Sequence, residues 1–283
     1  MGNMETEKSA TPLKTIVLRD LVAEKNSRLA GRIPQFVYGL MNRLLHIREI
    51  NEIITNYGHL KGIPFIEAVL RYFEVKVVYN GEENLPQSGK YIFASNHPLG
   101  GFDGLMLIKA VTDQMGKSLF LVRDELTKIP PLAELFIPIN KFGDQRRSAG
   151  VINEAYASDS QILIFPAGLA SRKIKGKIAD LTWQKHFIQK SVEHHRDVVP
   201  VFISGQNSGL FYWLANFRKW SGIRINLEMF LLSDELFKNR GKTFGITFGK
   251  PIPWNHFDRS KSHVEWAATV KDIVYELSMN QNK

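Results

Sequence analysis

The sequence predicts an α/β fold in which a mostly parallel central sheet is flanked by helices, with an N-terminal helical extension. Short segments rich in β-branched and aromatic residues alternate with amphipathic segments long enough to be helices. The chain has 283 residues and is 44% hydrophobic, which is enough for the core of one large domain. In such folds the functional groups lie in loops at the carboxyl ends of the strands.

The N-terminal part divides into a polar tail over residues 1–13 and a helical segment over residues 14–73. The helices expected in that segment cover residues 15–25, 34–57 and 64–75. On the second of them, one face carries Phe36, Leu40, Leu44 and Ile47. This stripe predicts either a helix lying in a membrane interface or a helix packed on the protein's own core.

Residues 74–283 form the main domain, and its elements follow one another with clear turn signals between them. Expected strands lie at 75–81, 90–96, 118–126, 161–168, 197–204, 225–231 and 242–252. Expected helices lie at 104–114, 149–160, 183–195 and 263–280, and residues 131–141 run from a helix into a strand.

Composition and charge limit the classes of function. Cysteine is absent, which excludes disulfides, thiolate nucleophiles and cysteine-based metal sites. The net charge of +9 favours anionic partners such as lipid or a phosphate-bearing substrate, and nucleic acid is not expected because no basic block is interleaved with aromatic residues. The N-terminus lacks a secretory signal, and no apolar run is long enough to span a bilayer. If the protein acts on lipid, we therefore expect it to lie peripherally on the cytoplasmic face of the cell membrane and not to span it.

One candidate catalytic loop follows the strand expected at 90–96. Asn96 and His97 leave the strand, and Asp103 returns after two glycines and a proline that allow a sharp turn. A carboxylate that binds one imidazole nitrogen fixes the tautomer and raises the basicity of the other nitrogen, which gives a general base for a hydroxyl. The alternative is that Asp103 only caps a helix and that His97 binds the backbone.

A second candidate loop follows the strand expected at 161–168. Small residues between Pro166 and Ser171 expose backbone N–H groups, and Arg172 and Lys173 add positive charge. Such a loop can hold a phosphate or an oxyanion.

Four segments in order resemble the motifs of the PlsC-type glycerolipid acyltransferase superfamily, over roughly residues 70–255. Asn96-His97 with Asp103 is similar to the motif N-H-x4-D. Ile139-Asn140-Lys141, with Arg146 and Arg147, resembles the second motif. Phe165-Pro166-Ala167-Gly168 with Ser171-Arg172 is similar to F-P-E-G-x-R-S, and Val198-Val199-Pro200-Val201 matches V-x-P-V.

The resemblance implies an O-acyltransferase of membrane lipid synthesis that needs no cofactor and takes acyl-CoA or acyl-acyl-carrier protein as co-substrate. His97 would be the general base, oriented by Asp103. The substrate-binding residues it implies are Asn96, Phe165, Pro166, Gly168 and Ser171, with Lys141, Arg146, Arg147 and Arg172 as contacts for a charged headgroup. The acceptor is left open between lysophosphatidic acid and a lyso-amino-acid lipid.

Three departures from the family pattern affect these expectations. Five residues, rather than four, separate His97 from Asp103, Ala167 stands where glutamate is usual, and Lys141 stands where arginine is usual. A non-catalytic membrane lipid-binding protein that keeps the fold is therefore the alternative function.

The sequence also bears on metal binding, on other classes of enzyme and on one aromatic-rich segment. No metal is expected, because His186 and His194 lack the spacing of a zinc helix, and the nucleophile elbow of a serine hydrolase is missing. The aromatic-rich stretch 211–220 is either an interfacial anchor or a buried helix. The sequence leaves the oligomeric state open.

Overall fold

The computed structural model describes residues 15–123, 126–127, 129–139, 145–222 and 226–279. Within them a seven-stranded sheet has the order β1-β9-β8-β2-β5-β3-β4. All neighbouring pairs are parallel except β8 and β9, so β1 and β9 run against the other strands. The predicted α/β class with a mostly parallel sheet is confirmed. The strands are β1 (Lys76–Asn80), β2 (Tyr91–Ser95), β3 (Ser118–Arg123), β4 (Phe136–Ile139), β5 (Gln161–Ile164), β8 (Asp197–Ile203) and β9 (Thr243–Phe248).

Helices cover both faces of the sheet, and β2 shows how its residues divide between them. Phe93 belongs to one core cluster, whereas Ile92 and Ala94 belong to the other, as the alternation along a strand requires. The first face is covered by α5 (Ile63–Tyr72) and α6 (Phe102–Met115), and the second by α7 (Gln145–Ala157), α8 (His186–His194) and α11 (His263–Leu277).

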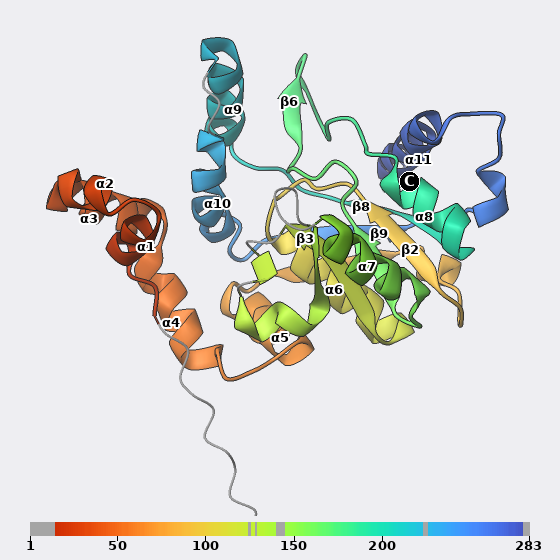
Figure 1. Ribbon diagram of the computed structural model, residues 1–283, viewed down its shortest axis with the longest axis horizontal. Helices are drawn as coiled ribbons and strands as arrows, with labels where there is room; N and C mark the ends of the chain where they lie inside the picture. Colours follow the sequence, from red (N-terminus) through yellow and green to blue (C-terminus); the bar gives the residue numbers. More distant parts are fainter. Residues whose placement is uncertain (1–14, 124–125, 128, 140–144, 223–225, 280–283) are drawn as a thin grey trace, which may run out of the picture.

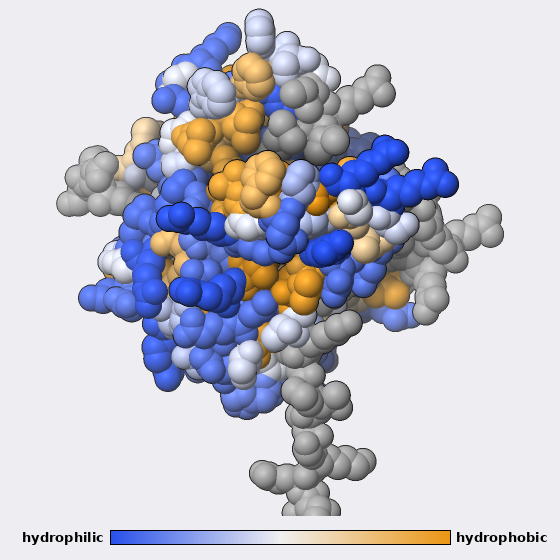
Figure 2. Space-filling view, turned by 90° about the vertical axis from the view of Figure 1, so that its left-hand side faces the viewer, coloured by the Kyte–Doolittle hydropathy of each residue, from blue (hydrophilic) through white to orange (hydrophobic). Residues whose placement is uncertain are grey.

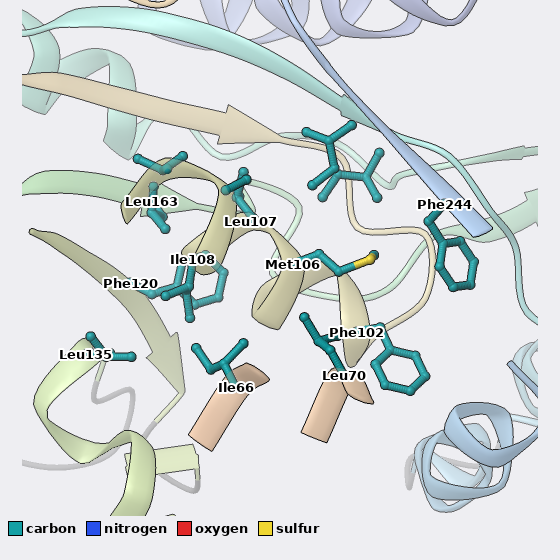
Figure 3. Packing of buried hydrophobic residues seen from close by; sticks show 14 of the residues in the cluster. Ile66, Leu70, Phe102, Met106, Leu107, Ile108, Phe120, Leu135, Leu163 and Phe244 are labelled. Carbon is teal, nitrogen blue, oxygen red and sulfur yellow. The ribbon is translucent and has the colours of Figure 1, made fainter. Parts of the chain in front are cut away.

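Helix α6 is the central helix of the first layer, and it carries Asp103 in its first turn. Its buried side chains Phe102, Met106 and Leu107 pack among residues of α5 and of strands β3, β5 and β9 (Figure 3). Fully burying an apolar side chain of this size stabilises a fold by about 1.5–3 kcal/mol. The start of α6 is therefore held rigidly at the carboxyl end of β2.

The N-terminal helices are α1 (Leu18–Lys25), α2 (Ser27–Arg32), α3 (Gln35–Leu44), α4 (Ile47–Tyr57) and α5. The single helix predicted over 34–57 is wrong: it breaks at His46, whose φ is 52°. The His46 ring stacks on Phe237 at 4.0 Å, and its Nε2 lies 3.2 Å from Oδ1 of Asp234. Contacts with the distant helix α10 (Leu232–Lys238) thus set this turn.

The apolar stripe of α3 is exposed to solvent. Phe36 and Leu40 are 77% and 66% exposed, and Leu44 is also exposed. Figure 1 shows α1–α3 as a layer set apart from the sheet, and Figure 2, seen from their side, shows orange apolar areas among polar ones. In the part of the chain that the structure describes, no helix is both long and apolar enough to cross a membrane.

One further element differs from the sequence prediction. The strand predicted over 225–231 is wrong, because Leu227–Leu231 form a 3-10 helix that leads into α10. The carboxylate of Glu228 lies buried between Arg172 and Arg218, and this contact, distant in sequence, overrides the local pattern. A hairpin of β6 (Arg172–Ile174) and β7 (Lys177–Ala179) and helix α9 (Gly209–Ser221) complete the domain, with short 3-10 helices at Glu82–Asn84, Pro130–Leu135 and Trp254–His256.

Candidate active site

The two loops singled out by the sequence meet at one edge of the sheet. Strands β2 and β5 are parallel neighbours, so the loops that follow them leave the sheet side by side. The backbone N–H of Ser171 donates to the carbonyl oxygen of His97 at 2.7 Å, which joins the second loop to the first. The fold therefore brings His97, Asp103 and the segment Phe165–Ser171 together.

His97 and Asp103 form a direct side-chain pair. Nδ1 of His97 lies 2.8 Å from Oδ2 of Asp103. The aspartate is fully buried, and the histidine side chain is 17% exposed. Because Nδ1 faces the carboxylate, Nε2 points away from it on the opposite edge of the ring. The five-residue spacing thus preserves the pair.

The carboxylate of Asp103 is held by backbone donors as well as by His97. Oδ2 accepts from the N–H groups of Leu99 and Gly100 at 2.9 and 3.1 Å, and Oδ1 accepts from Gly104 at 3.1 Å. Burial alone would raise the pKa of Asp103, but the charge and hydrogen bond of His97 and the bonds from Leu99 and Gly100 together hold it below its ordinary value. Asp103 is therefore ionised and able to stabilise a protonated His97.

The glycines between the pair are needed for geometric reasons. Gly100 has φ +79°, and a Cβ atom there would lie 2.7 Å from Cδ2 of Leu232 on α10. A Cβ atom on Gly101 would lie 2.8 Å from Cδ2 of Leu236. Gly101 is also the N-cap of α6, so Asp103 is not the N-cap residue and its carboxylate serves the loop and His97.

Phe165 lies against the imidazole. Its ring stacks on the His97 ring with 4.0 Å between centroids and 19° between planes, and it meets Phe120 edge to face at 5.0 Å. Stacking on one face and the hydrogen bond at Nδ1 together fix the orientation of the ring.

Asp180, which the sequence did not indicate, binds a residue of each of the two loops. Its Oδ1 accepts from the backbone N–H of His97 at 3.2 Å and from Oγ of Ser171 at 2.6 Å. Its Oδ2 accepts from Nε1 of Trp183 at 2.9 Å. Burial raises the pKa of Asp180, although Ser171, Trp183 and His97 act in the opposite direction. No local motif marks this residue, because its contact with His97 spans 83 positions.

Asn96 has a buried amide that is bonded to backbone. Its Nδ2 donates to the carbonyl oxygen of Ile203 at 2.9 Å, and its Oδ1 accepts from the N–H of Ile203 at 2.7 Å. It thus extends the pairing of β2 with β8 beyond the end of β2 and supports the residue that precedes His97.

The Pro-Gly loop presents Gly168 at the surface. Gly168 has φ +67°, and its N–H donates to the carbonyl oxygen of Phe165 at 2.9 Å in a tight turn. Pro166 is buried, and its carbonyl oxygen accepts from the N–H of Gln184. The turn brings Ser171 back to within hydrogen-bond distance of the His97 backbone.

Of the four cations expected to contact a headgroup, Arg172 is the one whose side chain the structure describes. Arg172 is only 5% exposed, and its Nη2 donates to Oε1 of Glu228 at 2.9 Å. Burial lowers the pKa of Arg172, with Glu228 opposing that effect. Arg146 and Arg147 lie in α7, but their side chains are outside the described ones, and Lys141 lies outside the described residues. Counted from Phe165, the arginine of F-P-E-G-x-R-S falls on Ala170, so Arg172 is two positions beyond it.

The histidines of α8 contact aromatic rings. His194 stacks on Tyr156 at 5.7 Å, and His186 meets the same ring edge to face at 6.1 Å. Among the residues that the structure describes, no group of three or more histidine or carboxylate side chains is placed to hold a metal.

Comparison with known proteins shows the family to which this chain belongs. A family model described as Acyltransferase matches residues 20–282. The chain is 48% identical over 247 residues to the lyso-glycine lipid O-acyltransferase of Bacteroides thetaiotaomicron, spanning 87% of this chain and 91% of that protein. It is 47% identical over 264 residues to the protein of the same name from Phocaeicola vulgatus, spanning 93% and 95%.

The protein is therefore an acyltransferase. It belongs to the acyltransferase family that this model describes, and the membership of the PlsC-type superfamily predicted from four motifs is confirmed. Among solved structures, the chain is similar to the 1-acyl-sn-glycerophosphate acyltransferase PlsC of Thermotoga maritima, with a TM-score of 0.45 and 19% identity over 84% of this chain and 95% of that one.

Proposed function

We propose that this protein transfers a fatty acyl group from acyl-CoA or acyl-acyl-carrier protein to a hydroxyl of a lyso-amino-acid lipid, with His97 as the general base. The observation that carries the proposal is the 2.8 Å contact between Nδ1 of His97 and a buried, ionised Asp103 at the carboxyl end of β2. Such a pair raises the basicity of Nε2 and stabilises the imidazolium that forms.

The reaction is a direct transfer. Nε2 of His97 takes the proton of the acceptor hydroxyl while that oxygen attacks the thioester carbonyl carbon. A C–O bond forms, the C–S bond breaks, and the imidazolium returns its proton to the departing thiolate. Asp103 keeps its charge throughout. No covalent acyl-enzyme is needed, and neither a metal nor a cofactor takes part.

A lyso-glycine lipid is the acceptor that the observations favour. Two relatives at 48% and 47% identity carry that substrate in their names. Glycine has no hydroxyl, so the hydroxyl that is acylated belongs to the lipid chain, and a glycine joined through its amine keeps a free carboxylate. Ala167 and Ala170 stand where the third motif has glutamate and arginine, which favours this acceptor over lysophosphatidic acid.

The site of action that fits this reaction is a membrane surface, and we place the protein peripherally on the cytoplasmic face. The outward stripe of α3, with Phe36 at 77% and Leu40 at 66% exposure, is typical of a helix that lies in a lipid interface. The net charge of +9 suits an anionic bilayer, CoA or an acidic carrier protein.

A transfer assay tests the proposal. Purified protein is incubated with radiolabelled acyl-CoA or acyl-acyl-carrier protein and with either lyso-glycine lipid or lysophosphatidic acid. We expect labelled diacylated glycine lipid, less product from lysophosphatidic acid, and a rate at least about 10²-fold lower with the His97→Gln variant. Binding of the lyso-lipid without any transfer would contradict the proposal and favour a non-catalytic lipid-binding protein.

A further inference from the structure

Helix α9 is apolar on two opposite sides. Phe211, Tyr212 and Ala215 are buried, and the first two pack in one cluster with Ala170 and Leu231. A second stripe points outward at the spacing of a helix face. It consists of Leu210, Trp213, Phe217 and Trp220, which are 52%, 59%, 38% and 83% exposed. Packing inside the protein explains the buried side of α9 but not the exposed stripe.

The outward rings of α9 form one continuous surface. Trp213 stacks on Phe217 with 5.3 Å between centroids and 11° between planes, and Phe217 lies 5.9 Å from Trp220. A helix of this length extends for about 20 Å. The stripe is a convex row of side chains. Such a row can insert into a partner, but it cannot form a pocket around one.

The β6–β7 hairpin adds positive charge beside this row. Its two-residue turn, Lys175-Gly176, has φ of 49° and 83°, as in a type I′ hairpin. Nδ2 of Asn216 on α9 donates to the carbonyl oxygen of Lys173, and Figure 1 shows α9 and β6 side by side above the sheet. The exposed hairpin side chains are Lys173, Ile174, Lys175 and Lys177.

This surface is tied to the candidate active site. The hairpin starts directly after Ser171, whose N–H binds the carbonyl oxygen of His97. Arg172 at its base and Arg218 on α9 both bind the fully buried Glu228, each through a contact of 2.9 Å. The α9–hairpin surface, defined by the four residues of the outward stripe and the four of the hairpin, therefore has a fixed position relative to His97.

The geometry points to the α9–hairpin surface as a second part of the protein, besides the outward stripe of α3, that lies on an anionic lipid bilayer. Tryptophan and phenylalanine rings settle at the level of the headgroups, and lysines beside them bind anionic lipids. An acidic carrier protein would match the lysines but not the convex row of rings. The inference rests on the proposed function only in taking the bilayer as the source of the acceptor.

Vesicle co-sedimentation tests the assignment without any catalysis. The probes are vesicles of phosphatidylcholine alone and of phosphatidylcholine with phosphatidylglycerol. We expect the triple variant Trp213→Ser, Phe217→Ser and Trp220→Ser to lower partitioning at least tenfold on both. Replacing the three hairpin lysines by glutamine should lower it about fivefold per lysine on the anionic vesicles only. Val78→Ser and Val264→Ser, at sites 50% exposed on β1 and α11, serve as matched controls.

An activity assay separates this inference from the proposed function. With a short-chain, water-soluble acceptor the triple variant should keep wild-type turnover, and with a vesicle-borne acceptor it should lose it. Wild-type protein that binds vesicles through this surface but transfers nothing would refute the function and not the surface. Three results would overturn the assignment. Both sets of variants could bind vesicles like the wild type, or they could lose binding to the carrier protein and keep binding to vesicles. Vesicle binding could also be lost only with Phe36→Ser and Leu40→Ser.

Discussion

The ring of Phe165 stacks on the ring of His97 at 4.0 Å, although the two residues come from loops after different strands. The neighbouring positions of β2 and β5 make this contact possible, and Phe120 packs against Phe165 at a right angle. One loop thus supplies the imidazole and the other keeps it facing Asp103.

Replacing Phe165 should therefore affect catalysis more than binding. Ring stacking of this kind contributes about 0.5–1.5 kcal/mol, so we expect Phe165→Leu to lower kcat by roughly 2–10-fold with little change in KM for the thioester. Phe165→Tyr keeps the ring and should keep most of the activity. A rise in KM with unchanged kcat would show that Phe165 binds substrate and does not orient His97.

Asp103→Asn should weaken both catalysis and stability. An amide cannot accept from all four donors, so at least one N–H group would face another donor, at a cost of about 2–3 kcal/mol at pH 7. Loss of the charge beside His97 should lower kcat by about 10²–10⁴-fold. Urea denaturation and a steady-state assay measure the two effects.

The stability difference between wild type and Asp103→Asn should depend on pH. The pKa of Asp103 in the folded protein lies below its ordinary value of 3.8. The stabilisation from the ionised group is therefore fully present above that value and is lost as the pH falls through the lower folded pKa. Urea titrations between pH 6 and pH 3 should show the two proteins converging, and a constant difference would contradict the assigned charge.

Gly100→Ala tests the loop between the pair. The φ of +79° and the approach to Leu232 should make this substitution cost about 1–3 kcal/mol. Adding Leu232→Ala should relieve the steric part but not the backbone strain. Gly150→Ala on α7, where a new Cβ atom meets nothing within 4 Å, should be neutral or stabilising in the same thermal unfolding assay.

Glu228→Gln tests the buried cluster at the base of the hairpin. Removing the charge between Arg172 and Arg218 should destabilise the protein by about 3–5 kcal/mol, because a buried guanidinium loses its counter-charge. The matched control is Glu74→Gln, which breaks the exposed pair with Arg240 and should cost less than about 1 kcal/mol. Similar losses from both variants would contradict the buried role of Glu228.

Much of the fold and the centre of the site follow from the sequence for a physical reason. Alternating strands and helices predict a mostly parallel sheet, and such a sheet brings the carboxyl ends of its parallel strands to one side, so the loops of His97 and Phe165 were expected there. Their direct contact comes from the adjacency of β2 and β5, which the structure shows. What the sequence could not give depends on contacts between distant residues. Asp180 reaches His97 across 83 positions, and His46 breaks a helix because of Phe237 and Asp234.

The buried ion pair of Arg172 and Glu228 could not be predicted from the sequence either. Arg172 looks like a surface cation in the sequence, because nothing local places a carboxylate beside it. Glu228 lies in a segment that reads as a strand, and only the folded chain makes it the buried partner of that arginine. Patterns of neighbouring residues therefore indicated the His–Asp pair, which is local, whereas the ion pair of Arg172 depends on a residue 56 positions away.

Proton removal by His97 is the central step of the proposed reaction, and single-turnover transfer by purified His97→Gln measures it. Labelled acyl thioester and lyso-glycine lipid are mixed with enzyme in excess, and thermal unfolding is checked in parallel. We predict a rate at least about 10²-fold below wild type in a variant that still unfolds in one cooperative transition. A rate within a few-fold of wild type would show that His97 is not the base.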